Sequence, residues 1–351
     1  MARERGRAGC AAESRARSED LLGTASRVRR WLLVEQPGPW GRDALTGSRL
    51  DEVIARTVAS HARRSGVRVL LIRRPGWRQA APRRVFTART DPHRSWLATR
   101  TIHDPRELVD LDLDDDDDVD RRPAPGEPTS GGDVDRRSAP GEPTSGGDVD
   151  RRFAPGEPAS GGIHLVCTHG RHDPCCADEG RPVVRALHAA GTPDVWETSH
   201  VGGDRFAANV VCLPSGVYFG RVPPADAARI VADHDAGLLD LGHYRGRCCF
   251  PPLVQAAEIF ARRELDEPRL CALDVRQASV SGDGADVVVH HGADALTVRV
   301  AREPGPPELL TCADGGASAP WRYRLVAMTQ TPMPTQTSTP TQMPTSTPRP
   351  A

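Results

Sequence analysis

The sequence contains no lysine, few aromatic residues and almost no net charge. None of its 46 basic residues is a lysine, aromatic residues make up 4% of the 351 positions, and the formal net charge is −1. The absence of lysine indicates a codon bias rather than a physical demand on the protein. A net charge this close to zero argues against a dedicated nucleic-acid-binding or membrane-surface protein.

Long apolar stretches are also missing. No run approaches the roughly 20 apolar residues that a membrane-spanning helix needs, and the charged start M-A-R-E-R-G-R-A-G-C is not followed by the apolar core of an export signal. We therefore expect a globular, cytoplasmic protein whose partner is neither a membrane nor a nucleic acid. Its nine cysteines then favour metal or redox chemistry over a secreted disulfide framework.

A repetitive segment divides the chain into two blocks. It starts with the acidic run 114–118 and continues as three copies of D-V-D-R-R-x-A-P-G-E-P-x-S-G-G that end at Gly162. Each copy is polar, rich in proline and glycine, and has no apolar face to stack on the next, which predicts a disordered tether. The expected order is a flexible N-terminus (1–26), an N-terminal α/β block (27–110), a disordered acidic linker (111–162), a second α/β domain (163–265), a β-rich extension (266–327) and a disordered Thr/Pro-rich tail (328–351).

The N-terminal block shows a strand, helix, strand, strand pattern. Apolar runs predict strands over 31–36, 67–72, 84–88 and 96–101, and apolar residues at spacings of three and four predict a helix over 48–64. Residues 1 to 104 hold 22 arginines against 10 acidic residues. We expect this basic excess to serve solubility or to meet an acidic redox partner.

After the linker, the pattern predicts the element order β-α-β-β-β-α. The expected elements are strands over 163–167, 195–201, 207–213 and 217–222 and helices over 179–190 and 225–235, with Pro182 in the first turn of the first helix. This order within about a hundred residues is that of a thioredoxin-like domain. We expect α/β as the fold class, followed by a hairpin near 287–300 and a last strand over 321–327.

Two pairs of chemically active residues fall in loops of this domain. Cys167 and Cys176 lie nine positions apart in C-T-H-G-R-H-D-P-C-C, and His200 and Asp204 lie four apart in H-V-G-G-D. Two soft ligands and two borderline ones are what a small iron-sulfur or zinc site needs. The strand order places both loops at one end of the sheet. A cysteine just before a helix also experiences the helix's positive end, which favours the thiolate that metals bind.

Other residues near these motifs have simpler expectations. The glycines at positions 202 and 203 would let the backbone approach a bulky cluster, because no Cβ stands in the way. Cys212 lies in a predicted apolar strand, so we expect it to point into the core.

The segments that carry these motifs resemble a known family. The runs C-T-H-G-R-H-D-P-C-C, V-W-E-T-S-H-V-G-G-D-R-F-A-A-N-V-V and G-V-Y-F-G-R-V are similar to sucrase/ferredoxin-like proteins, as are W-L-L-V-E-Q-P-G-P-W-G-R-D-A-L and Y-R-G-R-C-C-F-P. The resemblance covers most of residues 20–265 apart from the repeat. It implies a thioredoxin-like ferredoxin domain with a 2Fe-2S cluster. The N-terminal block could then be a second thioredoxin-like unit that lost its ligands after internal duplication.

Carried over residue by residue, the resemblance implies Cys167, Cys176 and His200 as cluster ligands. The family's second histidine falls on Asp204, a harder ligand whose negative charge should lower the cluster's reduction potential. Asp204 could instead cap its turn or pair with Arg205. The fourth ligand therefore has several candidates in the same two loops: Asp204, His169, His172 and Cys175.

Three functions remain open at this point. The first is a non-enzymatic electron carrier whose 2Fe-2S cluster exchanges electrons with an unidentified redox partner protein. The second is a thioredoxin-type thiol-disulfide oxidoreductase that uses Cys167, Cys175 and Cys176, although the missing C-x-x-C at the helix start counts against it. The third is a non-catalytic zinc or apo binding module that would use the same ligands.

Overall fold

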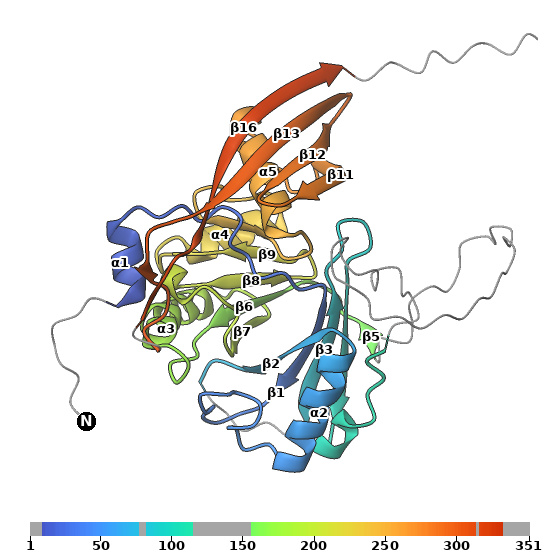
Figure 1. Cartoon of the computed structure of the whole chain (residues 1–351). Helices are drawn as coiled ribbons and strands as arrows, with labels where there is room; N and C mark the ends of the chain where they lie inside the picture. Colours follow the sequence, from blue (N-terminus) through green and yellow to red (C-terminus); the bar gives the residue numbers. More distant parts are fainter. Residues whose placement is uncertain (1–8, 77–81, 115–155, 314–315, 333–351) are drawn as a thin grey trace, which may run out of the picture.

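The strands of both blocks belong to one large sheet. The computed structural model describes residues 9–76, 82–114, 156–313 and 316–332. Within them, a ten-stranded sheet has the order β10-β9-β8-β6-β7-β2-β1-β3-β4-β5 (Figure 1). Most of the linker and tail predicted to be disordered lies outside the described residues. The sheet therefore joins segments that the repeat separates in sequence.

The N-terminal strands form one half of this sheet, which we call the first unit. In chain order its elements are β1 (Arg30–Glu35), α2 (Glu52–Arg64), β2 (Val67–Arg73), β3 (Arg83–Arg89), β4 (Trp96–Ile102) and the 3-10 helix η1 (Pro105–Leu108). Strands β1 and β2 are parallel, while β3 pairs antiparallel with both β1 and β4. The four predicted strands are confirmed to within one residue at each end.

Helix α2 starts later than its apolar pattern predicts. Asp51 is the N-cap, because its carboxylate accepts hydrogen bonds from the backbone of Val53 and Ile54. Val53, which fits the apolar spacing, is 73% exposed, whereas Leu50 and Val58 are buried against the sheet. The cap therefore sets the helix start and turns Val53 toward solvent.

The second unit forms the other half of the sheet. Its elements are β6 (Ile163–Cys167), α3 (Pro174–Ala189), β7 (Val195–Thr198), the 3-10 helix η3 (Asp204–Phe206), β8 (Val210–Leu213), β9 (Val217–Phe219) and α4 (Ala227–Asp235). Strands β6 and β7 are parallel, and β8 pairs antiparallel with β6 and β9. The predicted β-α-β-β-β-α order of a thioredoxin-like domain is confirmed.

The two units have the same topology. The strand order is β9-β8-β6-β7 in the second unit and β4-β3-β1-β2 in the first, so each unit places its fourth, third, first and second strand in that sequence. The units meet where β2 pairs antiparallel with β7, with Ile72 opposite Thr198 and Arg73 opposite Glu197. The first unit is therefore a second thioredoxin-like unit, as the resemblance suggested.

Helix α3 differs most from its predicted bounds. It begins at Pro174 instead of residue 179, because Asp173 caps it through a 2.8 Å hydrogen bond from the Cys175 backbone N–H. Pro182 consequently lies inside the helix instead of in its first turn. Cys176, expected in the loop before the helix, is the third helical residue.

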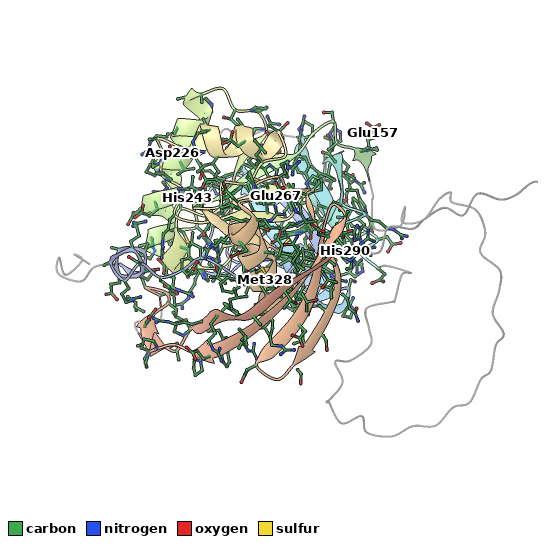
Figure 2. The ribbon with its side chains drawn as sticks, turned by 90° about the horizontal axis from the view of Figure 1, so that it is seen from above. Glu157, Asp226, His243, Glu267, His290 and Met328 are labelled. Carbon is green, nitrogen blue, oxygen red and sulfur yellow. The ribbon has the colours of Figure 1, made fainter. Side chains whose placement is uncertain are left out.

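The C-terminal region adds a curved sheet and a helix. Strand β10 (Tyr244–Arg247) pairs with β9, and α5 (Pro252–Leu265) packs against a four-stranded sheet of β11 (Leu273–Ser281), β12 (Gly284–His291), β13 (Asp294–Pro304) and β16 (Trp321–Pro332) (Figure 2). The predicted hairpin and last strand are confirmed, while α5 and β11 were not predicted. Strand β16 continues through residues 328–332, which were expected to belong to the disordered tail. Two short pairings also occur, β5 (Glu157–Pro158) with β4 and β14 (Glu308–Leu309) with β15 (Ala317–Ser318).

Part of the N-terminal segment is folded. Residues 1–26 were expected to be flexible, but helix α1 (Cys10–Ala16) buries Cys10, Ala11 and Ser14. This short helix is held by packing rather than by an intrinsic amphipathic pattern, which explains why the sequence did not reveal it. None of the helices in the described residues has the length and apolar character needed to cross a membrane.

Candidate metal centre

The two motifs of the second unit meet at one end of its sheet. Cys167 is the last residue of β6, Cys176 lies in the first turn of α3, and His200 follows β7. Their sulfur and ring nitrogen atoms all lie within 4.8 Å of one another. Asp204, the first residue of η3, completes the group, which we call the cysteine-histidine site.

The side chains of this site are in direct contact. Asp204 Oδ1 lies 3.1 Å from Cys176 Sγ and 3.0 Å from His200 Nδ1, and Cys176 Sγ lies 4.0 Å from the same nitrogen. Cys167 and Cys176 are 1% and 0% exposed, whereas the His200 side chain is 21% exposed. The thiols therefore form the buried side of the site and the histidine its outer side.

A glycine brings the two thiols together. Gly180 lies on α3 against the carbonyl oxygen of Cys167, and a Cβ at this position would overlap that oxygen. The helix can therefore pack directly on the end of β6. This close packing places the first turn of α3, and with it Cys176, beside Cys167.

Protons are shared within the site. The hydrogen bond between Cys167 and Cys176 lowers the pKa of Cys167. The same hydrogen bond and burial both raise the pKa of Cys176. Burial alone would lower the pKa of His200, but Asp204 and the Cys167 sulfur raise it to about 9. Burial opposes ionisation of Asp204, yet the hydrogen bond from His200 lowers its pKa overall. These shifts favour ionised Cys167 and Asp204 beside a protonated His200, and a metal ion could replace the protons of Cys176 and His200.

Two of the four candidates for a fourth ligand are engaged elsewhere. His169 Nε2 lies 2.7 Å from the carbonyl oxygen of Gly41, and its Nδ1 accepts a 3.3 Å hydrogen bond from the His200 backbone N–H. Cys175 points away from the site, toward Cys10 and Cys312 at 3.6 Å each. His169 therefore positions the backbone of His200, and Cys175 belongs to another group of side chains.

Asp204 and His172 remain beside His200. The His172 ring stacks on the His200 ring with centroids 3.8 Å apart, and His172 Nε2 lies 3.8 Å from Asp204 Oδ2. Ligand atoms of His172, His200 and Asp204 also lie within 4.8 Å of one another. Asp204 is the more buried of the two candidates and is the one that touches a cysteine.

The loop between His200 and Asp204 is held by a buried arginine that sequence reasoning missed. Arg245 is 1% exposed and donates to the carbonyl of Gly202 at 3.1 Å and to Asn209 Oδ1 at 2.7 Å. Burial lowers its pKa to about 10. The Y-R-G-R run that contains Arg245 was noticed only as part of the family resemblance. Its role as a positioning residue depends on β10 lying beside β9.

The two glycines of that loop have backbone conformations that other residues rarely adopt. Gly202 and Gly203 adopt φ angles of +100° and +79°. A Cβ on Gly202 would meet the Ser26 hydroxyl, and one on Gly203 would meet the Arg245 guanidinium. The glycines therefore permit a left-handed turn packed against Ser26 and Arg245.

The first unit covers the site. Trp40, in the loop after β1, lies edge-on to His169 with centroids 5.9 Å apart, and the neighbouring Gly41 carbonyl contacts the same ring. Arg68 donates a 2.9 Å hydrogen bond to the carbonyl of His200. The first unit thus supplies packing and hydrogen bonds to the site, although it contains no cysteine.

A buried ion pair joins the two units beside the site. Arg73 Nη2 lies 2.6 Å from Glu197 Oε2, and both side chains are less than a tenth exposed. The same carboxylate oxygen accepts a 2.7 Å hydrogen bond from Thr168, the residue after Cys167. The junction between the units is therefore linked directly to the cysteine loop.

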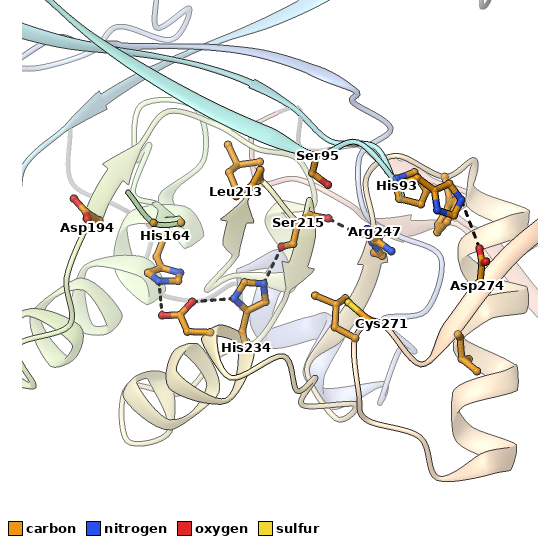
Figure 3. A pocket seen from close by; sticks show the side chains of 18 of the residues that line it. His93, Ser95, His164, Asp194, Leu213, Ser215, His234, Arg247, Cys271 and Asp274 are labelled. Atoms are coloured by element: carbon orange, nitrogen blue, oxygen red, sulfur yellow. Dashed lines mark hydrogen bonds and ion pairs between the residues drawn. The ribbon is translucent and has the colours of Figure 1, made fainter. Parts of the chain in front are cut away.

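A cavity lies at the end of the second unit opposite the cysteine-histidine site. Its volume is about 890 Å³, and its lining includes His164, Ser215 and His234 (Figure 3). Ser215 Oγ lies 2.8 Å from His234 Nε2, and His234 Nδ1 lies 3.2 Å from Asp235 Oδ1. The Ser215 oxygen also accepts a bond from the backbone of its own turn. These contacts tie the β8–β9 turn to α4. The turn follows Leu213, which pairs with Ile163 at the end of β6 opposite Cys167.

Fold and site together define a thioredoxin-like protein with a cysteine-histidine group of the kind that binds metals. A model of the sucrase/ferredoxin-like family matches residues 21–246, and the chain belongs to that family. It is also similar to a solved structure, a variant of the thioredoxin-like 2Fe-2S ferredoxin from Aquifex aeolicus. That likeness has 22% identity and a TM-score of 0.22, and covers 24% of this chain and 99% of the ferredoxin. No curated protein matches the chain.

Proposed function

We propose that the chain is an electron carrier that holds a 2Fe-2S cluster at Cys167, Cys176, His200 and Asp204. The observation that supports this most is the meeting of two buried thiols and a partly buried imidazole within 4.8 Å, from a strand, a helix and a loop of the second unit. Membership of a family described as ferredoxin-like adds to it. Such a cluster would supply the one-electron chemistry, and the protein would supply ligands and environment.

The donor set fits such a cluster. Thiolates are the usual ligands of iron-sulfur clusters, and in one class two histidines replace two cysteines on one of the irons. Here Cys167 and Cys176 would hold the buried side and His200 with Asp204 the outer side. Asp204 carries a negative charge, which should stabilise the oxidised state relative to a site with two histidines.

The outer side of the site is where a partner would exchange electrons. His172 and His200 line a cleft of about 340 Å³ together with Arg42, Arg63 and Arg68 from the first unit. A cleft with these arginines attracts acidic surfaces. We propose an acidic redox protein as the partner, docked over His200, which agrees in sign with the basic excess of the first 104 residues.

Burial argues against the thiol-disulfide alternative. Cys167 and Cys176 are almost completely inaccessible, so a disulfide of another protein could not reach either sulfur for exchange. The zinc-module alternative uses the same ligands. It is distinguished from a 2Fe-2S cluster by measuring whether the purified protein contains zinc or contains iron and sulfide.

The proposal is tested by the visible and EPR spectra of full-length protein purified without oxygen. We expect a brown protein with two irons and two acid-labile sulfides per chain, bleached by dithionite to a paramagnetic state. Cys167→Ser should remove the colour, whereas Cys271→Ser, which changes an exposed cysteine outside the site, should keep it. A colourless wild-type protein with one zinc that is lost in Cys167→Ser would contradict the proposal.

A further inference from the structure

A second group of cysteines lies next to the cysteine-histidine site. Cys10 begins α1, Cys175 lies in the first turn of α3, and Cys312 follows β14, so three distant parts of the chain meet. Their sulfur atoms and an oxygen of Asp173 all lie within 4.8 Å of one another. Figure 1 shows α1 beside α3, with the segment between β13 and β16 reaching the same place. We call these four residues the three-cysteine cluster.

The spacing of the cluster suits one tetrahedral metal ion. Cys175 Sγ lies 3.6 Å from Cys10 Sγ and 3.6 Å from Cys312 Sγ, and Cys10 Sγ lies 3.7 Å from Asp173 Oδ2. Sulfur ligands at about 2.3 Å from a tetrahedral zinc ion lie about 3.8 Å apart. The observed separations are close to that value, so a single ion could bind with little rearrangement.

Hydrogen bonds already orient the ligand atoms. Asp173 Oδ2 accepts from the Thr311 hydroxyl at 2.9 Å and from the Cys312 backbone N–H at 2.6 Å. The Cys10 backbone N–H donates to Cys312 Sγ at 3.2 Å. Bonds of this kind fix the ligands of structural metal sites and stabilise thiolates.

The backbone leaves space for the sulfur atoms. Gly9 lies so close to Cys175 that a Cβ on it would stand 2.8 Å from Cys175 Sγ, nearer than real Cβ atoms come. Cys10 and Cys175 are buried beside the Asp173 carboxylate, and a cation bound among them would compensate the charge of that carboxylate and of the thiolates.

We infer that the three-cysteine cluster binds one zinc ion through Cys10, Cys175, Cys312 and Asp173. Binding releases the thiol protons to solvent and involves no change of oxidation state. The ion would fasten α1 and the segment after β14 to the first turn of α3, which also carries Cys176. It would therefore hold one N-terminal and one C-terminal segment of the chain on α3, the helix that supplies Cys176.

The geometry favours a metal ion over a disulfide. A disulfide needs two sulfurs about 2.05 Å apart, and Cys175 lies equally far from two partners. A disulfide would also use only two of the three thiols and would leave Asp173 beside the third. A disulfide in the isolated protein is nevertheless an outcome that the experiment must detect.

The test measures zinc and iron per chain in full-length protein purified under reducing conditions. We expect about one zinc in the wild type and almost none in Cys312→Ser, whose side chain is only partly buried, so the variant should still fold. Iron should be unchanged in Cys312→Ser. Conversely, Cys167→Ser should keep the zinc, and Cys271→Ser should keep both metals. This pattern separates the inference from the proposed function, since each can fail without the other.

A spectroscopic measurement covers the case of a misfolded variant. Cys167→Ser apoprotein, in which the cysteine-histidine site lacks a ligand, is titrated with Co²⁺ and should show the intense visible bands of a tetrahedral ion with sulfur-to-cobalt charge transfer. Equal zinc in the wild type and in Cys312→Ser would overturn the inference. Mass spectrometry of wild-type protein kept in reducing buffer gives a second test. A mass two hydrogen atoms below that of the fully reduced chain, with a disulfide mapped between Cys175 and either Cys10 or Cys312, would also overturn the inference.

Discussion

The two halves of the large sheet have one topology and different contents. The second unit ends its first strand at Cys167 and carries Cys176 in the helix that follows, whereas the first unit ends its first strand at Glu35 and contains no cysteine. Instead, its loop after β1 places Trp40 and Gly41 over His169. The same strand order thus supports a ligand site in one half and a cover for that site in the other.

The comparison teaches that the fold does not depend on the ligands. The first unit buries its own core between α2 and the sheet, with Leu32, Val58 and Leu71 among its members. The side chains of the cysteine-histidine site lie together at one end of the second unit, on β6, on α3, in the loop after β7 and on η3, and the first unit folds without such a group. Four substitutions can break or sharpen this comparison.

The largest effect is expected at the junction of the units. Arg73→Met should lower the free energy of unfolding by about 3–5 kcal/mol, because Glu197 would keep a buried, uncompensated charge. Arg56→Met is the control, since Arg56 and its partner Glu52 are both exposed and their pair should contribute less than about 1 kcal/mol. Chemical denaturation measures both. If both substitutions lower the free energy of unfolding equally, the ion pair does not stabilise the junction between the two units.

Next in size is the support of the ligand loop. Arg245→Lys should lower the free energy of unfolding by about 2–3 kcal/mol and reduce iron content, because one amine cannot replace the bonds to Gly202 and Asn209 together. Arg247→Lys on the same strand is the control and should keep the iron. Full iron content with an unchanged reduction potential in Arg245→Lys would show that Arg245 does not position the loop.

A smaller effect is expected at the fourth ligand. Asp204→His should keep the cluster and raise its reduction potential, because a neutral ligand replaces an anionic one. His172→Ala should leave the potential almost unchanged, and protein-film voltammetry compares the two. If His172→Ala loses the cluster while Asp204→His does not change the potential, His172 is the fourth ligand instead.

The smallest effect is expected at the docking cleft. Arg63→Glu should slow oxidation of the reduced protein by ferricyanide about threefold at low salt, because it reverses a charge beside His200. Stopped-flow absorbance measures the rate. Arg276→Glu, on the C-terminal sheet, should have no such effect. If the rate of oxidation does not depend on the charge at position 63, electron exchange does not take place at this cleft.

Local patterns located the strands of the first unit and β6 to within one residue, predicted β7, β8 and β9 three residues too long, and did not reveal the tertiary contacts. Apolar runs located β1, β2, β3, β4 and β6 because each is a buried strand bounded by turn residues. The start of α3 was wrong because the D-P-C-C run was interpreted as loop, although Asp173 and Pro174 are a good N-cap and N1 pair.

The neighbours of the site were beyond sequence reasoning. Cys10, Cys175 and Cys312 are separated by more than a hundred residues each, so nothing local indicates that they meet. Arg245 likewise supports the ligand loop only because β10 folds back beside β9. In contrast, the grouping of Cys167, Cys176 and His200 follows from the element order, since Cys167 and His200 lie at the same end of the adjacent parallel strands β6 and β7 and Cys176 lies on the helix that follows β6.

The central claim is that the second unit alone holds a 2Fe-2S cluster. Its most direct test is the count of iron and acid-labile sulfide per chain, with the EPR spectrum of the reduced state, in the wild type and in Cys176→Ser. We predict two irons, two sulfides and one unpaired electron per chain in the wild type, and none of these in the variant. Wild-type protein without iron or sulfide, or a cluster that survives Cys176→Ser, would contradict the claim.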